Sequence, residues 1–386
     1  MRLALIGFGQ AGGKIVDQFV AYDRRTNSDI VGAAIAVNTA RVDLQGLEHI
    51  PEEDRVLIGQ SRVKGQGVGA DNELGAEIAE ADIDEMQGAI DRVPIHEVDA
   101  FLIVAGMGGG TGSGGAPVLA RHLKRIYTEP VYGLGVLPAK DEGGIYTLNA
   151  ARSLRTFLRE VDNLLVFDND AWREAGESLA GGYASLNGEI VRRMGMLFGA
   201  GEVTDADGVG ESVVDASEII NTLSGGGLTT IGYAAERVDP IPSGLLSRFS
   251  DDEPKPVETT NRIASLVRKA ALGRLTLPCD ISATEKSLVV ASGPPEYLDR
   301  KGVERGRRWI EDETGSMEVR GGDYPIPDSE QVAAAVILSG VTDVPRVREL
   351  QQIAIEAQDN IADVRQRSDE GLDGLLVDDK ELSPLF

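Results

Sequence analysis

Hydrophobic and polar residues follow two different rhythms along the first half of the chain. Short apolar runs, which predict strands, occupy residues 2–6, 30–37, 100–105, 131–137 and 163–167. Apolar residues recur every three or four positions, as in amphipathic helices, over 12–22, 73–90, 115–127 and 146–159. This order of strands and helices predicts an α/β domain with a doubly wound, mainly parallel sheet. Ligands of such sheets bind at the carboxyl ends of the strands.

A smaller second unit is predicted after one long helix. Residues 183–198 carry helical periodicity and predict a central helix that joins two domains. Further helices are predicted at 260–271 and 299–313, and strands at 287–291 and 333–338, which together form an α+β domain. The expected boundaries are 1–182 for the first domain, 183–205 for the central helix and connector, 206–345 for the second domain, 346–367 for a surface helix and 368–386 for an acidic, disordered tail.

Length and composition fit a cytoplasmic protein of two domains. The chain has 386 residues, of which 42% are hydrophobic. Cys279 is the only cysteine, so no internal disulfide can form, and a reducing compartment fits. The three scattered histidines have no metal-ligand spacing. The N-terminal apolar run is too short for a signal peptide, and no run of about 18 apolar residues predicts a membrane span.

The formal net charge of −25 narrows the possible partners. Such a surface repels nucleic acids and anionic lipids, so neither nucleic-acid binding nor direct membrane insertion is expected. Lysine is scarce, and acidic residues are spread along the whole chain rather than gathered in one tail. This pattern favours a halophile whose cytoplasm holds multimolar salt, where screening removes the self-repulsion; the alternative is an ordinary acidic protein.

The first glycine-rich loop leaves two ligand classes open. Gly7–Gly12 matches G-x-G-x-x-G between a predicted strand and a helix, the pattern of dinucleotide-binding folds. Such a fold also needs an acid after the second strand, where this chain has Asn38 and Thr39 instead. The motif around Lys14 lacks the hydroxyl residue and the spacing of a Walker A loop. A nicotinamide-dependent enzyme remains the competing hypothesis, which titration with NADH would test.

A second glycine-rich loop points to a polyphosphate. Six of the nine residues from Gly106 to Gly114 are glycine, and this segment lies between the buried run 100–105 and a predicted helix. Glycine at a helix start costs about 1 kcal/mol per residue relative to alanine, so we expect a compensating ligand. Backbone N–H groups around a phosphate chain supply that compensation, with hydroxyl donors from Thr111 and Ser113. The alternative is a flexible glycine turn.

Gly108–Gly114, with the sequence GGGTGSG, resembles the signature loop of the tubulin/FtsZ superfamily. Other nucleotide loops of that superfamily are matched in the same order by Gly9–Gly12, Asn38-Thr39, Gly65–Glu73, Pro138–Gly143 and Asn169-Asp170. The resemblance covers roughly residues 1–345 and is weaker in the second domain. Together with the acidic, lysine-poor composition and the absence of an FtsZ-type tail, the mixture of tubulin-like and FtsZ-like features resembles CetZ, a family of archaeal tubulin-like proteins.

The resemblance implies a set of GTP-binding residues. Tyr183 would stack on guanine and Asn187, one helical turn later, would hydrogen-bond the edge of the base. This pair is tubulin-like, because FtsZ has Phe and Asp there; simple core packing is the alternative for Tyr183. A hydrated Mg²⁺ would be held through water by Gln10, Asp71 and Asn72. The implied GTP-binding set is Gly9, Gln10, Ala11, Gly12, Lys14, Asn38, Gly106, Gly108, Gly109, Gly110, Thr111, Gly112, Ser113, Glu142 (on the ribose), Asn169 (on guanine), Tyr183 and Asn187.

Two acids beyond the central helix resemble the superfamily's catalytic loop. Asp215 and Glu218 would polarise the water that attacks the γ-phosphate; a helix-capping pair is the alternative. If the central helix leads away from guanine, these acids reach only the nucleotide of the next subunit, which forces head-to-tail filaments. Val213 replaces the asparagine of that loop and Tyr146 replaces the ribose-loop arginine of FtsZ, so hydrolysis can differ from that of FtsZ.

The resemblance therefore implies a cytoplasmic, GTP-binding cytoskeletal protein. It would hydrolyse GTP to GDP with Mg²⁺, polymerise with itself, take paralogous tubulin-like proteins as further candidate partners, and serve archaeal cell-shape control. The alternatives are an FtsZ-like cell-division protein and a scaffold that binds GTP without hydrolysing it, the latter suggested by Val213. Phosphate release under assembly conditions separates the scaffold from the GTPase.

Overall fold

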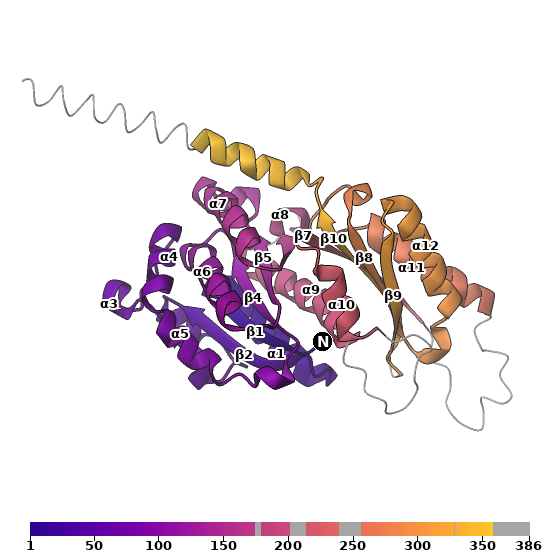
Figure 1. The fold of residues 1–386 in the computed structure, drawn as a ribbon, viewed down its shortest axis with the longest axis horizontal. Coiled ribbons are helices and arrows are strands. Elements are labelled where there is room, and N and C mark those ends of the chain that lie inside the picture. The colour runs from indigo at the N-terminus through magenta and orange to yellow at the C-terminus, as the bar shows by residue number, and fades with distance from the viewer. Residues whose placement is uncertain (174–178, 201–213, 239–255, 328, 358–386) are drawn as a thin grey trace, which may run out of the picture.

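A computed structural model describes residues 1–173, 179–200, 214–238, 256–327 and 329–357 (Figure 1). These residues build one ten-stranded sheet with the order β3-β2-β1-β4-β5-β6-β7-β10-β8-β9. Pairing is parallel from β3 through β7 and antiparallel on both sides of β10. The strands are β1 Leu3–Phe8, β2 Val31–Asn38, β3 Arg55–Leu57, β4 Ala100–Gly106, β5 Val131–Leu137, β6 Asn163–Asp168, β7 Leu228–Arg237, β8 Lys286–Gly293, β9 Glu318–Pro325 and β10 Gln331–Val341.

Helices cover both faces of this sheet, as expected for a doubly wound α/β fold (Figure 1). Alternate residues of each strand feed two apolar cores, so that Ile6 packs under one face and Leu5 under the other. One core is closed by α4–α7, α11 and α12, and the other by α1, α9 and α10. The helices are α1 Gly9–Thr26, α2 Arg41–Gln45, α3 Gln60–Val63, α4 Asn72–Ala81, α5 Ile83–Ile90, α6 Gly110–Ile126, α7 Gly144–Glu160, α8 Asn169–Trp172, α9 Leu179–Ala200, α10 Ala216–Leu223, α11 Pro256–Leu272 and α12 Arg300–Thr314, and a further helix spans 345–357.

The predicted central helix is α9, which is longer than the sequence pattern indicates. Its 22 residues span about 33 Å at 1.5 Å per residue. Ile190, Met194 and Leu197 are fully buried between α1 and the sheet. The sheet runs without a break from the first unit into the second, because β7 pairs with β6. The domain boundaries drawn from the sequence therefore stay predictions.

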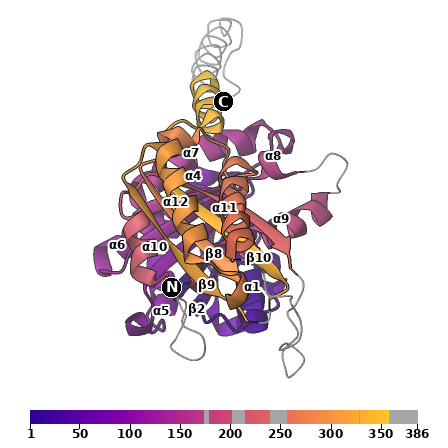
Figure 2. The same ribbon diagram turned by 90° about the vertical axis from the view of Figure 1, so that its right-hand side faces the viewer.

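Two local expectations are wrong. The helix expected at 73–90 is two helices, because Asp82 leaves helical geometry and its carboxylate accepts the Gly59 N–H at 2.5 Å. The helix expected from residue 115 begins at Gly110, inside the signature loop. The helix 345–357 lies at the surface, at the top of Figure 2, and buries Arg346 and Leu350 on one side. The expected tail 368–386 lies outside the described residues.

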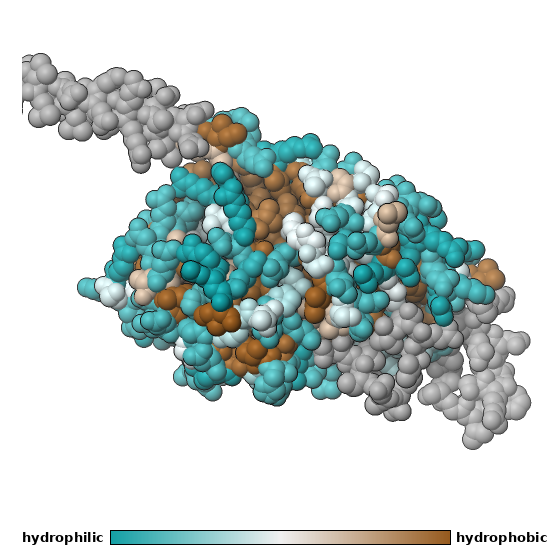
Figure 3. All heavy atoms as spheres, viewed as in Figure 1, coloured by the Kyte–Doolittle hydropathy of each residue, from teal (hydrophilic) through white to brown (hydrophobic). Residues whose placement is uncertain are grey.

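The surface in Figure 3 is mainly hydrophilic, with smaller hydrophobic areas between the polar side chains. No helix among the described residues is both long enough and apolar enough to cross a membrane.

Candidate functional site

The signature loop forms the N-terminus of α6, directly after the buried strand β4. Gly109 precedes the helix with extended backbone angles, and Gly110 is its first residue. The Gly110 N–H donates to the Gly69 carbonyl at 2.9 Å, and the Ser113 hydroxyl donates to the Gly109 carbonyl. Both groups therefore have partners within the protein, whereas the sequence predicts free N–H and hydroxyl groups around a phosphate chain. The N–H groups of Gly108, Gly109, Thr111 and Gly112 have no acceptor among the described residues.

The first glycine loop lies against this helix start. Gly9 opens α1 with φ = +74°, and a side chain there would place its Cβ 2.9 Å from the Gly112 nitrogen. A Cβ at Gly112 would in turn lie 2.8 Å from the Gly106 carbonyl oxygen. Glycine is required at both places because two backbones meet there. The N-termini of α1 and α6 are thus brought together, and both point positive dipole ends and free amides at one region.

Side chains from residues 38–43, which follow β2, connect the N-termini of α1 and α6. Asp43 accepts from the Gln10 amide at 3.1 Å and from the Asn38 amide at 3.1 Å. The hydroxyls of Thr39 and Thr111 lie 2.7 Å apart in a buried contact. The predicted residues Gln10 and Asn38 are therefore joined by a carboxylate that the sequence reading did not single out. Asp43 carries no motif of its own, and only its position after the second strand pointed to it.

Asn149 on α7 is a second residue that sequence reasoning missed. Its buried amide donates to the Ala70 carbonyl at 2.7 Å and to the Gly108 carbonyl at 2.9 Å. It thereby fixes the segment Gly65–Glu73 against the signature loop. Its place on the inner face of an amphipathic helix, which also buries Thr147 and Ser153, was the available signal, since buried amides need partners.

Two of the residues predicted for ribose and base, Glu142 and Tyr183, are in contact. Glu142 accepts the Ala139 N–H at 2.7 Å and a hydrogen bond from the Tyr183 hydroxyl. Burial, and secondarily Glu142, raises the pKa of Tyr183 to about 12. Asn169 is buried at the start of α8, whereas Asn187 is half-buried on α9, one turn beyond Tyr183. This groups the acid, the tyrosine and the long helix at the carboxyl end of the sheet.

The candidate cation residues do not form a closed metal site. The Asp71 carboxylate caps α4 by accepting the Leu74 N–H at 2.9 Å, and Gln10 is bonded to Asp43. No cluster of three or more acidic, histidine or cysteine side chains that could hold a metal occurs among the described residues. Gln10, Asp71 and the adjacent Asn72 fit a cation that phosphate oxygens bind and that these side chains contact only through water. They fit a cation bound directly by the side chains less well. Lys14 lies on the exposed side of α1.

A buried ion pair connects these loops to the helix 345–357. Arg346 is 6% exposed, donates to the Pro138 carbonyl at 3.0 Å, and lies 3.7 Å from Asp168, which precedes Asn169. Burial raises the pKa of Asp168 to about 6, although the Arg346 guanidinium opposes the shift. Lys140 adds a bridge to Glu349 at 2.9 Å. The loops around Glu142 and Asn169 therefore rest on the first turns of this helix.

The two candidate catalytic acids lie apart from these loops, at the start of α10 (Figure 1). Asp215 caps that helix: its carboxylate accepts the Glu218 N–H at 2.9 Å and the Ser217 hydroxyl at 2.6 Å, which hold its pKa below the usual range. The capping alternative is thus part of the geometry. Burial and, next, the charge of Asp215 raise the pKa of Glu218, while Arg320 and Arg307 oppose the rise. Val213 lies outside the described residues.

Two family models together match almost the whole chain. The model described as "Tubulin/FtsZ family, GTPase domain" matches residues 2–177, and that described as "Tubulin-like CetZ, C-terminal domain" matches residues 176–356. The chain is also 71% identical to the tubulin-like protein CetZ1 of Haloferax volcanii over 374 residues, which is 95% of either chain. The chain belongs to the CetZ family.

Solved CetZ structures share this fold. A GDP-bound CetZ1 monomer from Haloferax volcanii has a TM-score of 0.84 at 68% identity, covering 93% of this chain and all of that one. A GTPγS-bound CetZ2 protofilament from the same organism has a TM-score of 0.83 at 46% identity, covering 94% and 100%. The predicted family and the tubulin/FtsZ-like fold are therefore confirmed.

Proposed function

We propose that this CetZ protein binds GTP and assembles head-to-tail, and that the hydrolysis of GTP is completed by the next subunit. The observation that carries the proposal is the meeting of two helix N-termini, at Gly9 and Gly112, with unsatisfied amides on both. Oriented amides at paired dipole ends are suited to a chain of phosphates. The GTPγS-bound protofilament of a relative supports both the ligand and the mode of assembly.

In this proposal each group of residues has one role. The amides of Gly9–Gly12 and those of Gly108, Gly109, Thr111 and Gly112, with the Thr111 hydroxyl, bind the phosphates. Glu142 receives the ribose hydroxyls, while Asn169, Tyr183 and Asn187 bind guanine. Mg²⁺, held through water by Gln10, Asp71 and Asn72, would neutralise charge on the phosphates. The Ser113 hydroxyl supports the start of α6 by donating to the Gly109 carbonyl, and Lys14 stays a candidate GTP-binding residue.

Hydrolysis is assigned to the acids on α10. Glu218, partly buried and raised in pKa, is the better proton acceptor for an attacking water, whereas Asp215 is held ionised by its capping bonds. These acids follow α9, which is about 33 Å long, so they serve the nucleotide of an adjacent subunit. Arg320 and Arg307 oppose the rise in the pKa of Glu218 and so favour its carboxylate form.

The cellular role proposed is control of cell shape in a halophilic archaeon, in its cytoplasm. The acidic, lysine-poor composition and the similarity to a Haloferax volcanii protein support that setting. Self-assembly is the main interaction, and paralogous CetZ proteins are further candidate partners. A division role and a scaffold without hydrolysis stay the alternatives.

Sedimentation with GTP or GDP, in molar KCl with Mg²⁺, tests the proposal. We expect a pellet with GTP and none with GDP, together with phosphate release that follows assembly. Equal sedimentation with both nucleotides would refute a γ-phosphate-dependent polymer. Assembly without phosphate release would favour the scaffold, and micromolar NADH binding that GTP fails to displace would revive the nicotinamide enzyme.

A further inference from the structure

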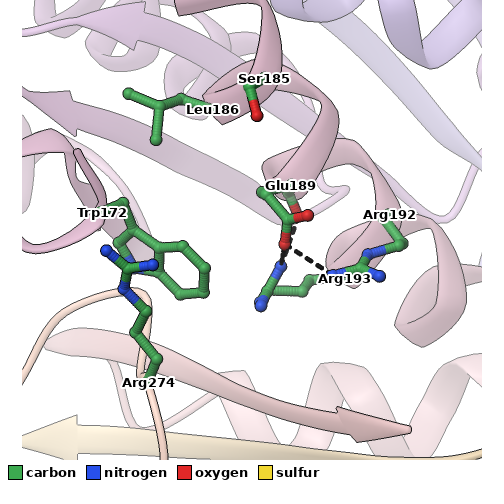
Figure 4. A pocket seen from close by; sticks show the side chains of 7 residues that line it. All are labelled: Trp172, Ser185, Leu186, Glu189, Arg192, Arg193 and Arg274. Carbon is green, nitrogen blue, oxygen red and sulfur yellow. Dashed lines mark hydrogen bonds and ion pairs between the residues drawn. The ribbon is translucent and has the colours of Figure 1, made fainter. Parts of the chain in front are cut away.

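A pocket with a volume of about 310 Å³ lies at the junction of α8, α9 and the segment after α11 (Figure 4). Three of its side chains are guanidinium groups and one is a carboxylate, in a chain of net charge −25. Such a local excess of positive charge is unusual on an acidic protein and marks a site for anions. Its lining residues are Trp172, Ser185, Leu186, Glu189, Arg192, Arg193 and Arg274.

Arg193 forms the buried part of this pocket. It is 4% exposed, is ion-paired with Glu189, and lies 4.2 Å from the centre of the Trp172 ring. Its Nε atom is buried and has no hydrogen-bond partner among the described residues. Buried guanidinium donors are normally satisfied, because leaving one unmet costs about 1–3 kcal/mol. Arg193 therefore adds a buried and incompletely paired positive charge to the wall of the pocket.

Arg192 and Arg274 provide the exposed side of the pocket. Arg274 donates through Nε to the Ala171 carbonyl at 3.0 Å and lies 4.5 Å from the Trp172 ring centre, so its orientation is fixed. No acidic side chain within ion-pair distance of Arg274 occurs among the described residues. Arg192 shares the single carboxylate of Glu189 with Arg193. Among the described residues, the Glu189 carboxylate therefore leaves positive charge uncompensated at the opening.

The pocket is separate from the guanine site. Ser185, Glu189 and Arg192 recur at helical spacing on α9, about 180° around the helix from Tyr183 and Asn187 at 100° per residue. Trp172 of α8 and Arg274, which follows α11 in the second unit, lie together on one side of the pocket, and the side chains of α9 lie on the other (Figure 4). A bound anion would thus join the two units on the far side of the central helix.

We propose that this pocket binds a small oxyanion with two charged oxygens, a dicarboxylate or a phosphate, between Arg193 and Arg274. Planar guanidinium forks match carboxylate and phosphate oxygens in pairs, which gives them an advantage over a spherical chloride ion. Leu186 offers contact for a short carbon chain, and Ser185 a further hydroxyl. By bridging both units, the ligand stabilises their arrangement around α9.

Fluorescence of Trp172 measures this binding directly. The chain has two tryptophans, so Trp309→Phe leaves Trp172 as the only indole. The full-length protein, saturated with GDP to fill the nucleotide site, is titrated in molar KCl with succinate and, separately, with inorganic phosphate. Molar salt screens weak attraction of ions to the surface. A saturable change with succinate assigns a carboxylate ligand, and one with phosphate alone assigns a phosphate ligand.

Arg274→Gln and Arg192→Gln, both at exposed positions, should each weaken the binding by about 10- to 100-fold, as expected for one charge-assisted contact. Arg268→Gln is the matched control, because Arg268 lies on Trp309 outside the pocket and should leave the affinity unchanged. Retained GDP binding shows that each variant is folded. The proposal is overturned if neither anion gives a saturable change, or if Arg274→Gln and Arg192→Gln bind as tightly as Arg268→Gln.

Discussion

Gly109→Ala separates the packing role of the signature loop from its ligand role. A Cβ at Gly110 would lie 2.6 Å from the Asp71 carbonyl oxygen, so glycine there is explained by packing alone. A Cβ at Gly109 meets no atom within 4 Å, and its φ of −75° and ψ of 164° suit any residue. Packing therefore gives no reason for glycine at 109. The proposed phosphate site supplies a reason, because the phosphates need that opening.

The stability of the Gly109→Ala protein should stay close to that of the wild type. Alanine is a poorer residue than glycine before a helix, at a cost of up to about 1 kcal/mol. The reduced freedom of the unfolded chain offsets that cost by about 0.4–1 kcal/mol. Binding should suffer more, since a methyl group beside the amides of Thr111 and Gly112 displaces at least one charge-assisted hydrogen bond. One such bond contributes about 1.5–3 kcal/mol, which predicts a loss of roughly 10- to 150-fold in GTP affinity.

Isothermal titration with GTP and chemical denaturation, on the same preparation, test this prediction. Gly88→Ala is the matched control: Gly88 also faces open space, but it lies on α5 away from the loops. It should bind GTP normally and gain up to about 1 kcal/mol of stability. Wild-type GTP affinity in Gly109→Ala would show that the opening is not used by phosphate. A large loss of stability would show that the glycine has a packing role after all.

Three further predictions concern charge. Assembly followed by light scattering should improve from about 0.1 M to about 1 M KCl, because the Debye length falls from about 10 to about 3 Å while the subunit charge stays −25; better assembly at low salt would contradict this. Arg320→Gln should raise the pKa of Glu218 further and move the acid limb of the GTPase pH profile to higher pH, since the base must be ionised; an unmoved limb would exclude this coupling. Asp168 has a pKa of about 6, so between pH values of about 4 and 6 it binds a proton in the folded protein but not in the unfolded protein. The free energy of unfolding should therefore fall by up to about 3 kcal/mol as the pH rises through that window. Denaturation of Asp168→Asn at several pH values should lack this slope.

The sequence predicted the parallel half of the sheet because its strands are buried on both faces and read as unbroken apolar runs. It missed β7, although this strand joins the two units. Leu228–Arg237 contains Thr229, Thr230 and a glycine, which show neither alternation nor an apolar run. The two threonines are buried only because Asn163 and Thr276 satisfy their hydroxyls, through partners at least 46 residues away.

The site was predictable where function depends on local backbone shape. Glycine loops can be recognised in the sequence because close approach of two backbones excludes other residues. Asp43, Asn149 and Arg346 gave no such signal, since each acts by reaching another loop through the fold. The basic pocket around Arg193 was equally hidden, because its arginines come from segments separated by about 80 residues and no local spacing links them.

Phosphate release by Glu218→Gln tests the central claim most directly. The substitution keeps the shape of the side chain and the N–H that Asp215 caps, but removes the proton acceptor. Glu311→Gln, exposed on α12, is the matched control for loss of one negative charge. The account predicts unchanged GTP affinity and GTP-dependent pelleting for Glu218→Gln, with phosphate release lowered by about 10²–10⁴-fold. Release at the rate of Glu311→Gln, or a loss of GTP affinity, would contradict hydrolysis by the adjacent subunit.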